Sequence, residues 1–403
     1  MGTTYSLKIV EHHSKIIDSH GLQKEVDSLL FQINIQLSTY IDSSVISEFN
    51  RNYSLEPIAV SPEVYEVAEK AVNMYQLSGG SFDATVKPLV DLWGFGPQFK
   101  TSQIPDSSKI KETILKVGSE KLIVKNGNLQ KTNRQLQIDL SAIAKGWGVD
   151  KLAEYLLQKG FNNFMVEIGG EIVVSGLNKD NQPWKIGILH PDGLHSELYS
   201  KIEVSNKAVA TSGIYQNYIT WEGNVYSHLI NPITGYPIQH DLVSATIVAQ
   251  DCATADAIAT AVMVKGYDEG LRWINNLPNV ECLLVKKSDT SEYIALYPNV
   301  LLGVHRDHFY SIIIQPISSE KSIEHVSIYY AKKPKEMPHL KNLIDTNAHF
   351  WKEVFLEDVG VVEGMQRGRK GLMFDGGKFS PVMDSATHCF HQWVAQLVKN
   401  YRS

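Results

Sequence analysis

The sequence predicts an α+β protein in which a mixed or antiparallel sheet packs against helices. Several stretches have the three- and four-residue apolar spacing of amphipathic helices, and others are short apolar runs with the length of strands. The two kinds do not alternate regularly, as they would around a doubly wound parallel sheet. The chain has 403 residues, 43% hydrophobic and 20% charged, which is typical of a folded globular protein and excludes a disordered, coiled-coil or fibrous chain.

Helices are expected where apolar periodicity stops at a glycine or at a polar turn. Residues 21–40 have helical spacing, and Ser61 followed by Pro62 begins a helix that ends at Gly79. Further helices are expected at residues 139–159 and 253–265, each closed by a glycine. Short apolar strands are expected at residues 164–168, 171–174, 185–189 and 280–286.

The character of the chain changes near residue 295. Seven of the fourteen histidines follow this point, although it leaves only the last quarter of the chain. The remaining segment contains 13 basic and 11 acidic residues, whereas the chain as a whole has a net charge of −6. We therefore predict two domains, residues 1–294 and 295–403, the second a C-terminal α+β fragment. Its expected elements are strands at 308–317 and 325–330 and helices at 351–367 and 387–401.

Charge and composition also limit the partners and the compartment. A mildly acidic chain has no general attraction to nucleic acid or to an anionic membrane. No apolar run reaches the roughly 20 residues of a membrane span, and the start lacks a signal peptide, so we expect a cytoplasmic chain. The three cysteines are too few and too scattered for a disulfide framework or a zinc site, and we expect buried thiols.

Three glycine-containing segments have the features of ligand-binding loops. In residues 79–96, glycines allow a ligand to approach the backbone and Asp83 offers a hydrogen-bond acceptor, although a helix stop followed by a turn explains the same pattern. Residues 139–148 place a polar turn and Lys145 at a helix start, which suits a phosphate but also suits an Asp cap on a core helix. Residues 167–171 contain Gly169-Gly170, a loop for close approach or simply a tight hairpin.

Two further positions carry side chains suited to catalysis. His228 comes at a strand end before a turn, where an imidazole can act as a base, although a lone histidine is more often structural. Asp256 and Thr260 share one helix face, and a carboxylate and a hydroxyl beside a carbonyl form a hard oxygen site suited to Mg²⁺. The alternative for Asp256 is a capping or solvated carboxylate.

Taken in order, these segments resemble the FAD:protein FMN transferases, also called ApbE-type flavin transferases, over roughly residues 1–294. Members of that family cleave FAD and attach FMN through a phosphoester bond to a threonine of an acceptor flavoprotein, releasing AMP, and they need Mg²⁺. Acceptors include subunits of electron-transporting complexes and FMN-binding domains. The matching stretches are Met1–Tyr5, Ser38–Tyr40, Ser44, Ile46–Ser47, Asn50, Gly79–Thr85, Leu92–Gly96, Asp139–Asp150, Val166–Glu171, Ala210–Gly213, His228–Gly235 and Ala255–Ala261.

The resemblance also implies roles for individual residues. It implies that Asp256, Thr260 and the backbone carbonyl of Ala142 hold the metal, and that His228 is the base for the acceptor threonine. Asp256 is therefore catalytic through the metal. The residues implied to contact FAD are Met1, Tyr40, Ser81, Phe82, Asp83, Lys145, Glu167, Gly169, Gly170 and Glu171.

This chain departs from the family pattern at three places. Asn231 and Ile214 stand where the family often has Asp. The loss of these two carboxylates affects the expected strength of metal binding or the contacts with the acceptor. The family is usually periplasmic and lipid-anchored, with a signal and a strand before the Met-Gly-Thr block. Here Met1 is that block, so the comparison implies a truncated start.

The C-terminal segment has recognisable stretches at residues 303–308, 315–317, 351–369, 375–381 and 388–393. Through them it resembles the end of the catalytic domain of Rieske-type aromatic-ring-hydroxylating oxygenase large subunits. Asp358 matches the carboxylate that ligates iron in that family, but the histidine pair falls outside the segment and no CxH…CxxH cluster is present. We therefore expect no oxygenase iron site, and His388 and His391 are expected to lie on a core helix. Alternatives to the transferase are an FAD pyrophosphatase, a non-catalytic FAD-binding protein and, less favoured, an oxygenase fragment.

Overall fold

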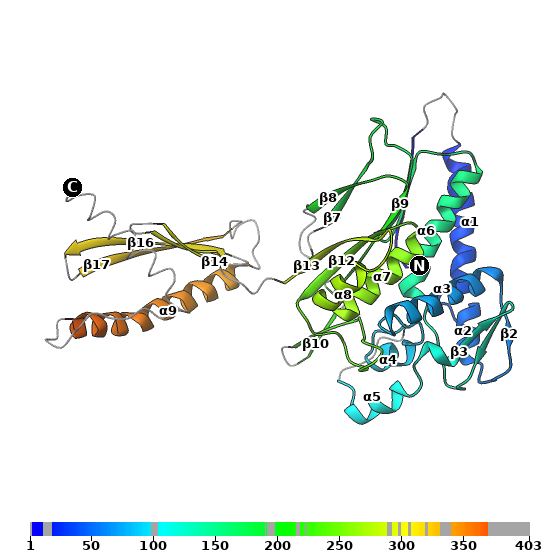
Figure 1. Ribbon diagram of the computed structural model, residues 1–403, viewed down its shortest axis with the longest axis horizontal. Helices are drawn as coiled ribbons and strands as arrows, with labels where there is room; N and C mark the ends of the chain where they lie inside the picture. Colours follow the sequence, from blue (N-terminus) through cyan, green and yellow to red (C-terminus); the bar gives the residue numbers. More distant parts are fainter. Residues whose placement is uncertain are drawn as a thin grey trace. The chain divides into compact units, whose positions relative to one another are not determined.

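The chain divides into two compact units, residues 1–287 and 288–403 (Figure 1). We predicted a division after residue 294, but β14 (Glu292–Leu296) pairs with β15 (Val300–Val304) and so belongs to the second unit. The computed structural model describes residues 2–10, 18–97, 104–189, 191, 198–214, 218–221, 224–287, 292–296, 300–304, 308–318, 321–330 and 340–369.

The first unit is built on a six-stranded sheet in which every neighbouring pair is antiparallel. In Phe164–Ile168 alternate side chains are buried, because successive residues of a strand point to opposite faces of the sheet. The predicted α+β class is confirmed. In spatial order the strands are β1 (Tyr5–Ile9), β5 (Phe164–Ile168), β6 (Glu171–Ser175), β9 (Lys207–Gly213), β12 (Leu242–Ala249) and β13 (Glu281–Lys286).

Helices pack on this sheet and on one another (Figure 1). The predicted start of α3 is confirmed, because the Ser61 hydroxyl accepts a hydrogen bond from the Val64 amide, and Gly79 at φ 64° ends the helix. The helix α7 is buried on nearly every face, since it lies between α6 and strands β9 and β12. The helices are α1 (Ser19–Leu37), α2 (Val45–Arg51), α3 (Pro62–Ser78), α4 (Lys87–Leu92), α5 (Ser107–Ile114), α6 (Ser141–Gln158), α7 (Cys252–Lys265) and α8 (Tyr267–Ile274).

Smaller sheets flank the central one. The hairpin β10 (Tyr218–Trp221) and β11 (Asn224–Ser227) leads directly to His228. A second hairpin joins β7 (Trp184–Leu189) to β8 (Leu198–Val204). The remaining strands are β2 (Ile58–Ala59), β3 (Leu122–Lys125) and β4 (Asn128–Lys131), with a 3-10 turn at Ser119–Lys121.

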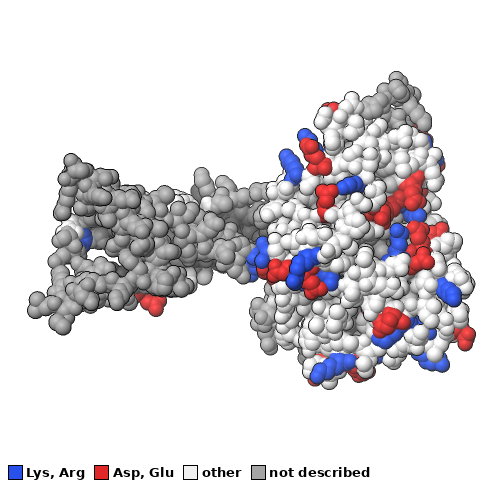
Figure 2. Space-filling view, in the orientation of Figure 1, with Lys and Arg blue, Asp and Glu red and all other residues white. Residues whose placement is uncertain are grey.

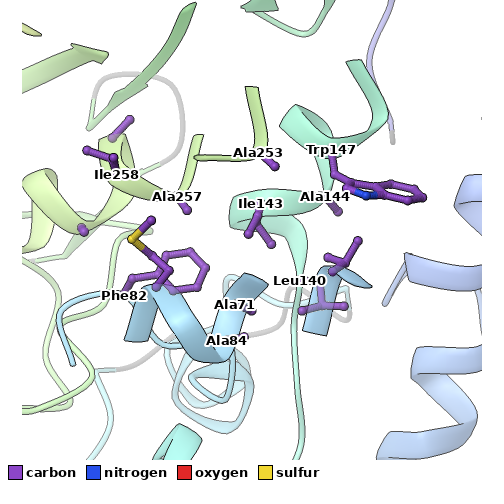
Figure 3. Close-up of a cluster of buried hydrophobic side chains, with 14 of the residues drawn as sticks. Ala71, Phe82, Ala84, Leu140, Ile143, Ala144, Trp147, Ala253, Ala257 and Ile258 are labelled. Carbon is purple, nitrogen blue, oxygen red and sulfur yellow. The ribbon is translucent and has the colours of Figure 1, made fainter. Parts of the chain in front are cut away.

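The main hydrophobic core joins α3, α6 and α7 to the turn that follows α3 (Figure 3). Phe82 and Ala84 of this turn are buried beside Ile143 of α6 and Ile258 of α7. The helices α6 and α7 approach so closely that a Cβ at Gly146 would lie 2.2 Å from the Cys252 carbonyl oxygen. Glycine at this position is therefore required by helix packing.

In the residues that the structure describes, the second unit contains a four-stranded antiparallel sheet and a long helix. Its strands are β14, β15, β16 (His308–Ser318) and β17 (Lys321–Tyr330), in that spatial order. Both predicted strands are present, whereas α9 (Leu340–Arg369) begins well before the predicted residue 351. Apolar spacing in fact begins at Leu340, but the polar run that follows obscures it. The predicted helix at 387–401, with His388 and His391, and the Asp358 side chain lie outside the described residues.

Charges of both signs are interspersed over the face of the first unit that Figure 2 shows. Many charged side chains of the first unit are paired, as Lys286 is with Asp241 at 2.8 Å and Lys265 with Glu269 at 2.6 Å. Within the described parts of the chain, no helix combines the length and the apolarity that crossing a bilayer requires.

Candidate active site

Asp256 is buried in the middle of α7, with 3% of its surface exposed. Its Oδ2 accepts a hydrogen bond from the backbone amide of Gly146 in α6, at 3.1 Å. A capping or solvated carboxylate is therefore excluded, because the group is neither at a helix end nor in water. Burial raises the pKa of Asp256, an effect that the positive charge of Lys145 opposes.

Lys145 and Glu171 form an ion pair beside this carboxylate, with 2.5 Å between Nζ and Oε1. Glu171 is 2% exposed, and its Oε2 is buried without a hydrogen-bond partner. Burial, followed by the charge of Asp256, raises the pKa of Glu171 to about 8. Burial alone would lower the pKa of Lys145, but the charges of Asp256 and Glu171 outweigh it and raise that pKa. Two buried carboxylates thus share one ammonium group.

This cluster fits a divalent cation. Ionised carboxylates in excess over cations, with hydroxyl and carbonyl oxygens beside them, are the donor set that Mg²⁺ prefers. Thr260 lies one turn after Asp256, and its hydroxyl is 3.4 Å from that of Ser212 in β9. Ala142 lies in the first turn of α6. Among the described residues no three His, Cys, Asp or Glu side chains gather as metal ligands, so a cation bound here would also need hydroxyl or backbone carbonyl oxygens.

The glycine pair between β5 and β6 forms a two-residue hairpin turn, as the simpler interpretation expected. Gly169 and Gly170 have φ of 63° and 105°, and the Gly170 amide donates to Glu167 Oε1 at 2.8 Å. The Gly169 amide donates to the Thr4 carbonyl at 3.1 Å, so the N-terminal segment lies beside this turn. Met1, predicted to contact FAD, lies outside the described residues.

The side chains of the 79–85 segment are used within the fold. Phe82 is in the core, and Ser81 is also buried. Asp83 accepts hydrogen bonds from Thr85 and Ser119, through the hydroxyl and the amide of each. A ligand can therefore contact this segment mainly through its backbone. The predicted contacts of FAD with the Ser81, Phe82 and Asp83 side chains remain a prediction.

The start of α6 is capped by its own polar turn, because Asp139 Oδ1 accepts from the Ser141 amide at 2.9 Å. The Asp139 amide donates to the Ala84 carbonyl at 2.7 Å, which joins this turn to the 79–85 segment. Tyr40 has 68% of its surface exposed. Partial desolvation, followed by the charges of Asp139 and Asp91, raises the pKa of Tyr40 even though most of its surface is exposed.

His228 follows the β10–β11 hairpin and lies against an aromatic cluster. Its ring centroid is 6.4 Å from that of Phe95, in an edge-to-face arrangement. Trp93, two residues before Phe95, stacks on Tyr226 at 5.7 Å and meets Tyr236 edge-on at 5.9 Å. The two predicted segments around residues 92–96 and 228–235 therefore pack against each other through these aromatic rings.

The departure from the family pattern at Asn231 leaves the local turn intact. Asn231 Oδ1 accepts from the amides of Ile233 and Thr234, at 2.9 and 3.2 Å. An amide oxygen performs this role as a carboxylate would. At the other departure, Ile214 packs against the main core and its amide donates to the Val243 carbonyl at 3.1 Å.

Asp150 is a site residue whose role sequence reasoning missed. Its two carboxylate oxygens accept from the amides of Cys252 and Ala253, at 2.8 and 2.9 Å. It therefore caps the start of α7 and fixes the helix that carries Asp256. No sequence signal marked it, since its partners lie about a hundred residues further along the chain.

Comparison with known proteins connects this arrangement to flavin chemistry. The model of the ApbE family matches residues 1–284. The FAD:protein FMN transferase of Vibrio cholerae serotype O1 is 42% identical over 289 residues, covering 72% of this chain and 86% of the relative. That of Haemophilus influenzae is 36% identical over 295 residues, covering 72% and 85%.

Solved structures agree with these sequence relatives. The flavin transferase ApbE from Vibrio cholerae superposes with a TM-score of 0.65 at 42% identity, covering 72% of this chain and 92% of its own. The apo form of the Pseudomonas stutzeri flavinyl transferase ApbE gives a TM-score of 0.63 at 32% identity, covering 71% and 90%. Together with the fold and the buried cluster, these similarities define a flavin transferase. The chain belongs to the ApbE family, and it is an FAD:protein FMN transferase.

A second family model, that of the ring-hydroxylating alpha subunit catalytic domain, matches residues 253–400. Its first part overlaps α7, α8 and β13, which belong to the first unit in the structure. The predicted resemblance of the C-terminal segment to the catalytic domain of ring-hydroxylating oxygenases is thus confirmed.

Proposed function

We propose that this transferase attaches FMN to a threonine of its acceptor protein and uses Mg²⁺ held by Asp256, Thr260 and the Ala142 carbonyl. The buried Lys145–Glu171–Asp256 cluster carries the proposal, because two buried carboxyl groups face one ammonium group and a cation at the start of α6 would favour their ionised forms. Bound Mg²⁺ would neutralise phosphate oxygens and stabilise AMP as the leaving group.

The residues of this chain orient FAD around that point. Lys145 offers an ammonium group to the pyrophosphate, while Glu171 holds the lysine in place through their ion pair. Tyr40 presents an exposed ring, on which a flavin or an adenine can stack. A Cβ at Gly170 would meet no atom within 4 Å, so a ligand can approach the backbone of the turn there.

His228 accepts the proton of the acceptor threonine. The threonine oxygen forms a bond to the FMN phosphorus as the bond from that phosphorus to the bridging oxygen breaks, and AMP leaves. A threonine hydroxyl is a weak nucleophile at neutral pH, so a positioned base is needed. The Phe95 contact and the Trp93 cluster support this role, since they fix the backbone that presents the imidazole.

Incubation with FAD, MgCl₂ and an FMN-binding domain tests the proposal. The expected product is a domain heavier by one FMN less one water, with AMP released in equal amount. The same domain with its target threonine replaced by alanine is the control and should stay unmodified. Free FMN and AMP at the same rate with either domain would instead show an FAD pyrophosphatase, and FAD that stays bound and intact would show a carrier.

A further inference from the structure

The hydroxyl of Thr260 meets a second hydroxyl on a neighbouring strand. Its Oγ1 lies 3.4 Å from the Oγ of Ser212 in β9, and among the described residues this is the hydrogen-bond partner of the Thr260 side chain. A threonine inside a helix can instead donate to the carbonyl four residues earlier, as Thr113 of α5 donates to Lys109 at 2.7 Å. The Thr260 hydroxyl is therefore directed away from its own helix and toward β9.

Ser212 lies on the face of the central sheet that packs against α7. It pairs with Ala245 of β12, and Ala245 belongs to the core cluster that contains α7. Thr211 lies on the opposite face, since successive strand residues alternate, and its hydroxyl is 2.8 Å from that of Thr246. Adjacent residues of β9 thus form two hydroxyl pairs, one facing α7 and one facing away from it.

Glu171 lies on the same face of the sheet as Ser212 and near the same end. Val173 of β6 pairs with Ala208 of β9, and strand residues two or four positions apart share a face. Glu171 is the first residue of β6, and Ser212 is the next-to-last residue of β9. Because the two strands are antiparallel, the start of β6 and the end of β9 lie at one end of the sheet. Ser212 therefore lies at the end where Glu171 forms its buried ion pair.

A threonine hydroxyl that binds a cation needs an acceptor for its proton. The oxygen has two lone pairs and one hydrogen, so a neutral hydroxyl that gives a lone pair to a cation must direct its hydrogen elsewhere. Partners that hold metal ligands in this way orient them and raise the affinity for the metal. Without a cation either hydroxyl of the pair can be the donor. A cation on Thr260 makes Thr260 the donor and Ser212 the acceptor.

We propose that Ser212 is a positioning residue for Mg²⁺, because its Oγ accepts the Thr260 proton and leaves a Thr260 lone pair for the metal. The inference rests on the proposed Mg²⁺ site at Asp256, Thr260 and the Ala142 carbonyl. The separation of 3.4 Å is longer than the distance of about 2.7–2.8 Å at which two hydroxyl groups usually meet. We therefore expect the pair to shorten when Mg²⁺ binds.

Mn²⁺ binding to the full chain, with FAD present and no acceptor, tests this inference. Mn²⁺ prefers the same oxygen ligands as Mg²⁺, and the electron paramagnetic resonance signal of the free ion reports binding and its displacement by Mg²⁺. Ser212→Ala should weaken the binding of both ions about tenfold, as removal of such a partner typically does. Ser212→Thr keeps the hydroxyl and should retain most of the affinity. Thr211→Val is the matched control, because it removes a hydroxyl from the other face of β9, and it should bind as the parent does.

Two further measurements separate positioning from a general effect on the fold. In the Thr260→Val chain, Ser212→Ala should cause no further loss of affinity, because Ser212 acts only through Thr260. FMN transfer by Ser212→Ala should need about tenfold more Mg²⁺ for half the maximal rate and should reach the parent rate at saturating Mg²⁺. The circular dichroism spectra of all variants should match that of the parent.

The outcomes distinguish the role of Ser212 from the metal site itself. Equal Mn²⁺ affinity of the parent and Ser212→Ala overturns the inference and leaves the proposed Mg²⁺ site in place. An equal loss in Ser212→Ala and in folded Ser212→Thr also overturns it, because the hydroxyl would then not be the cause. A parent chain that binds no Mn²⁺, or that binds it equally well after Asp256→Ala, overturns the Mg²⁺ site of the proposed function and the inference with it.

Discussion

The two units of the chain differ in what they bury. The first unit encloses carboxylates and a lysine among several hydrophobic clusters. Hydrogen bonds from the Gly146 amide of α6 to Asp256 of α7, and from the Gly169 amide to the Thr4 carbonyl, join distant parts of its sequence. In the described part of the second unit, the buried side chains are Tyr310, Ile312 and Trp351, all from one cluster between the sheet and α9. Other apolar side chains of that sheet, such as Ile313 and Ile323, are exposed.

The difference shows what a catalytic site of this kind needs from a fold. Keeping two carboxylates out of water is costly, and only a large, well-packed core compensates for that cost. The first unit has such a core on both sides of α7. Every predicted site residue of the transferase lies in this unit. We therefore expect residues 1–287 to carry out FMN transfer without help from the second unit.

The largest effect is expected from removing the buried carboxylate of the first unit. Asp256→Ala should abolish FMN transfer, because it removes the only carboxylate assigned to the metal, while FAD still binds through the other contacts. Transfer and FAD binding are measured at several Mg²⁺ concentrations. Asp268→Ala on the exposed start of α8 is the matched control and should behave as the parent. Transfer at the parent rate by Asp256→Ala would remove the metal assignment.

A large effect is also expected at the aromatic cluster. His228→Ala should lower the transfer rate roughly 10²–10⁴-fold, the usual contribution of a positioned base, with little change in FAD affinity. Single-turnover transfer at saturating FAD provides the rate. His20→Ala, at an exposed helix start, serves as the control. Normal turnover with weakened FAD binding would make His228 a binding residue instead.

A smaller effect concerns a buried lysine of the first unit. Lys131 is 1% exposed, its ammonium donates to the Asn52 carbonyl at 2.7 Å, and burial lowers its pKa to about 8. A lowered folded-state pKa means that burying the charged lysine costs stability, and that this cost is full below pH 8 and shrinks as the pH rises above that value. Relative to Lys131→Met, the free energy of unfolding should therefore rise by about 1 kcal/mol between pH 7 and pH 9.

Urea unfolding at both pH values checks this shift. The control is Lys125→Met, at an exposed position of β3. Its free energy of unfolding relative to the parent should not change between pH 7 and pH 9, which shows that losing a lysine as such has no pH-dependent effect. A difference between parent and Lys131→Met that does not change with pH would show that the lysine keeps its ordinary pKa in the folded chain.

Local elements of the fold were largely predictable from the sequence. The boundaries of β5 and the start and end of α3 follow from apolar spacing, a serine cap and a terminating glycine, which are signals within a few residues. The start of α9 was missed because polar residues interrupt its apolar spacing. The unit boundary was also misplaced, since only strand pairing shows that β14 belongs to the second sheet.

The site was predictable in its residues and less so in its contacts. Spacing put Asp256 and Thr260 on one helix face, but only the packed structure shows that Asp256 is buried against Gly146. The cap from Asp150 to α7 and the internal use of Asp83 depend on partners far along the chain or across a turn, which no local pattern encodes. Through-space contacts of this kind decide whether a polar residue serves a ligand or the fold.

The most direct test of the assignment to one unit compares residues 1–287 with the full chain. All four hydrophobic clusters that surround the site lie within residues 1–287, so this fragment should fold, as circular dichroism and cooperative thermal unfolding can check. We expect it to transfer FMN to the acceptor domain, with the same Mg²⁺ dependence and the same kcat as the full chain. A fragment that folds but has lost FAD binding or transfer would contradict the account, because it would show that the second unit completes the site.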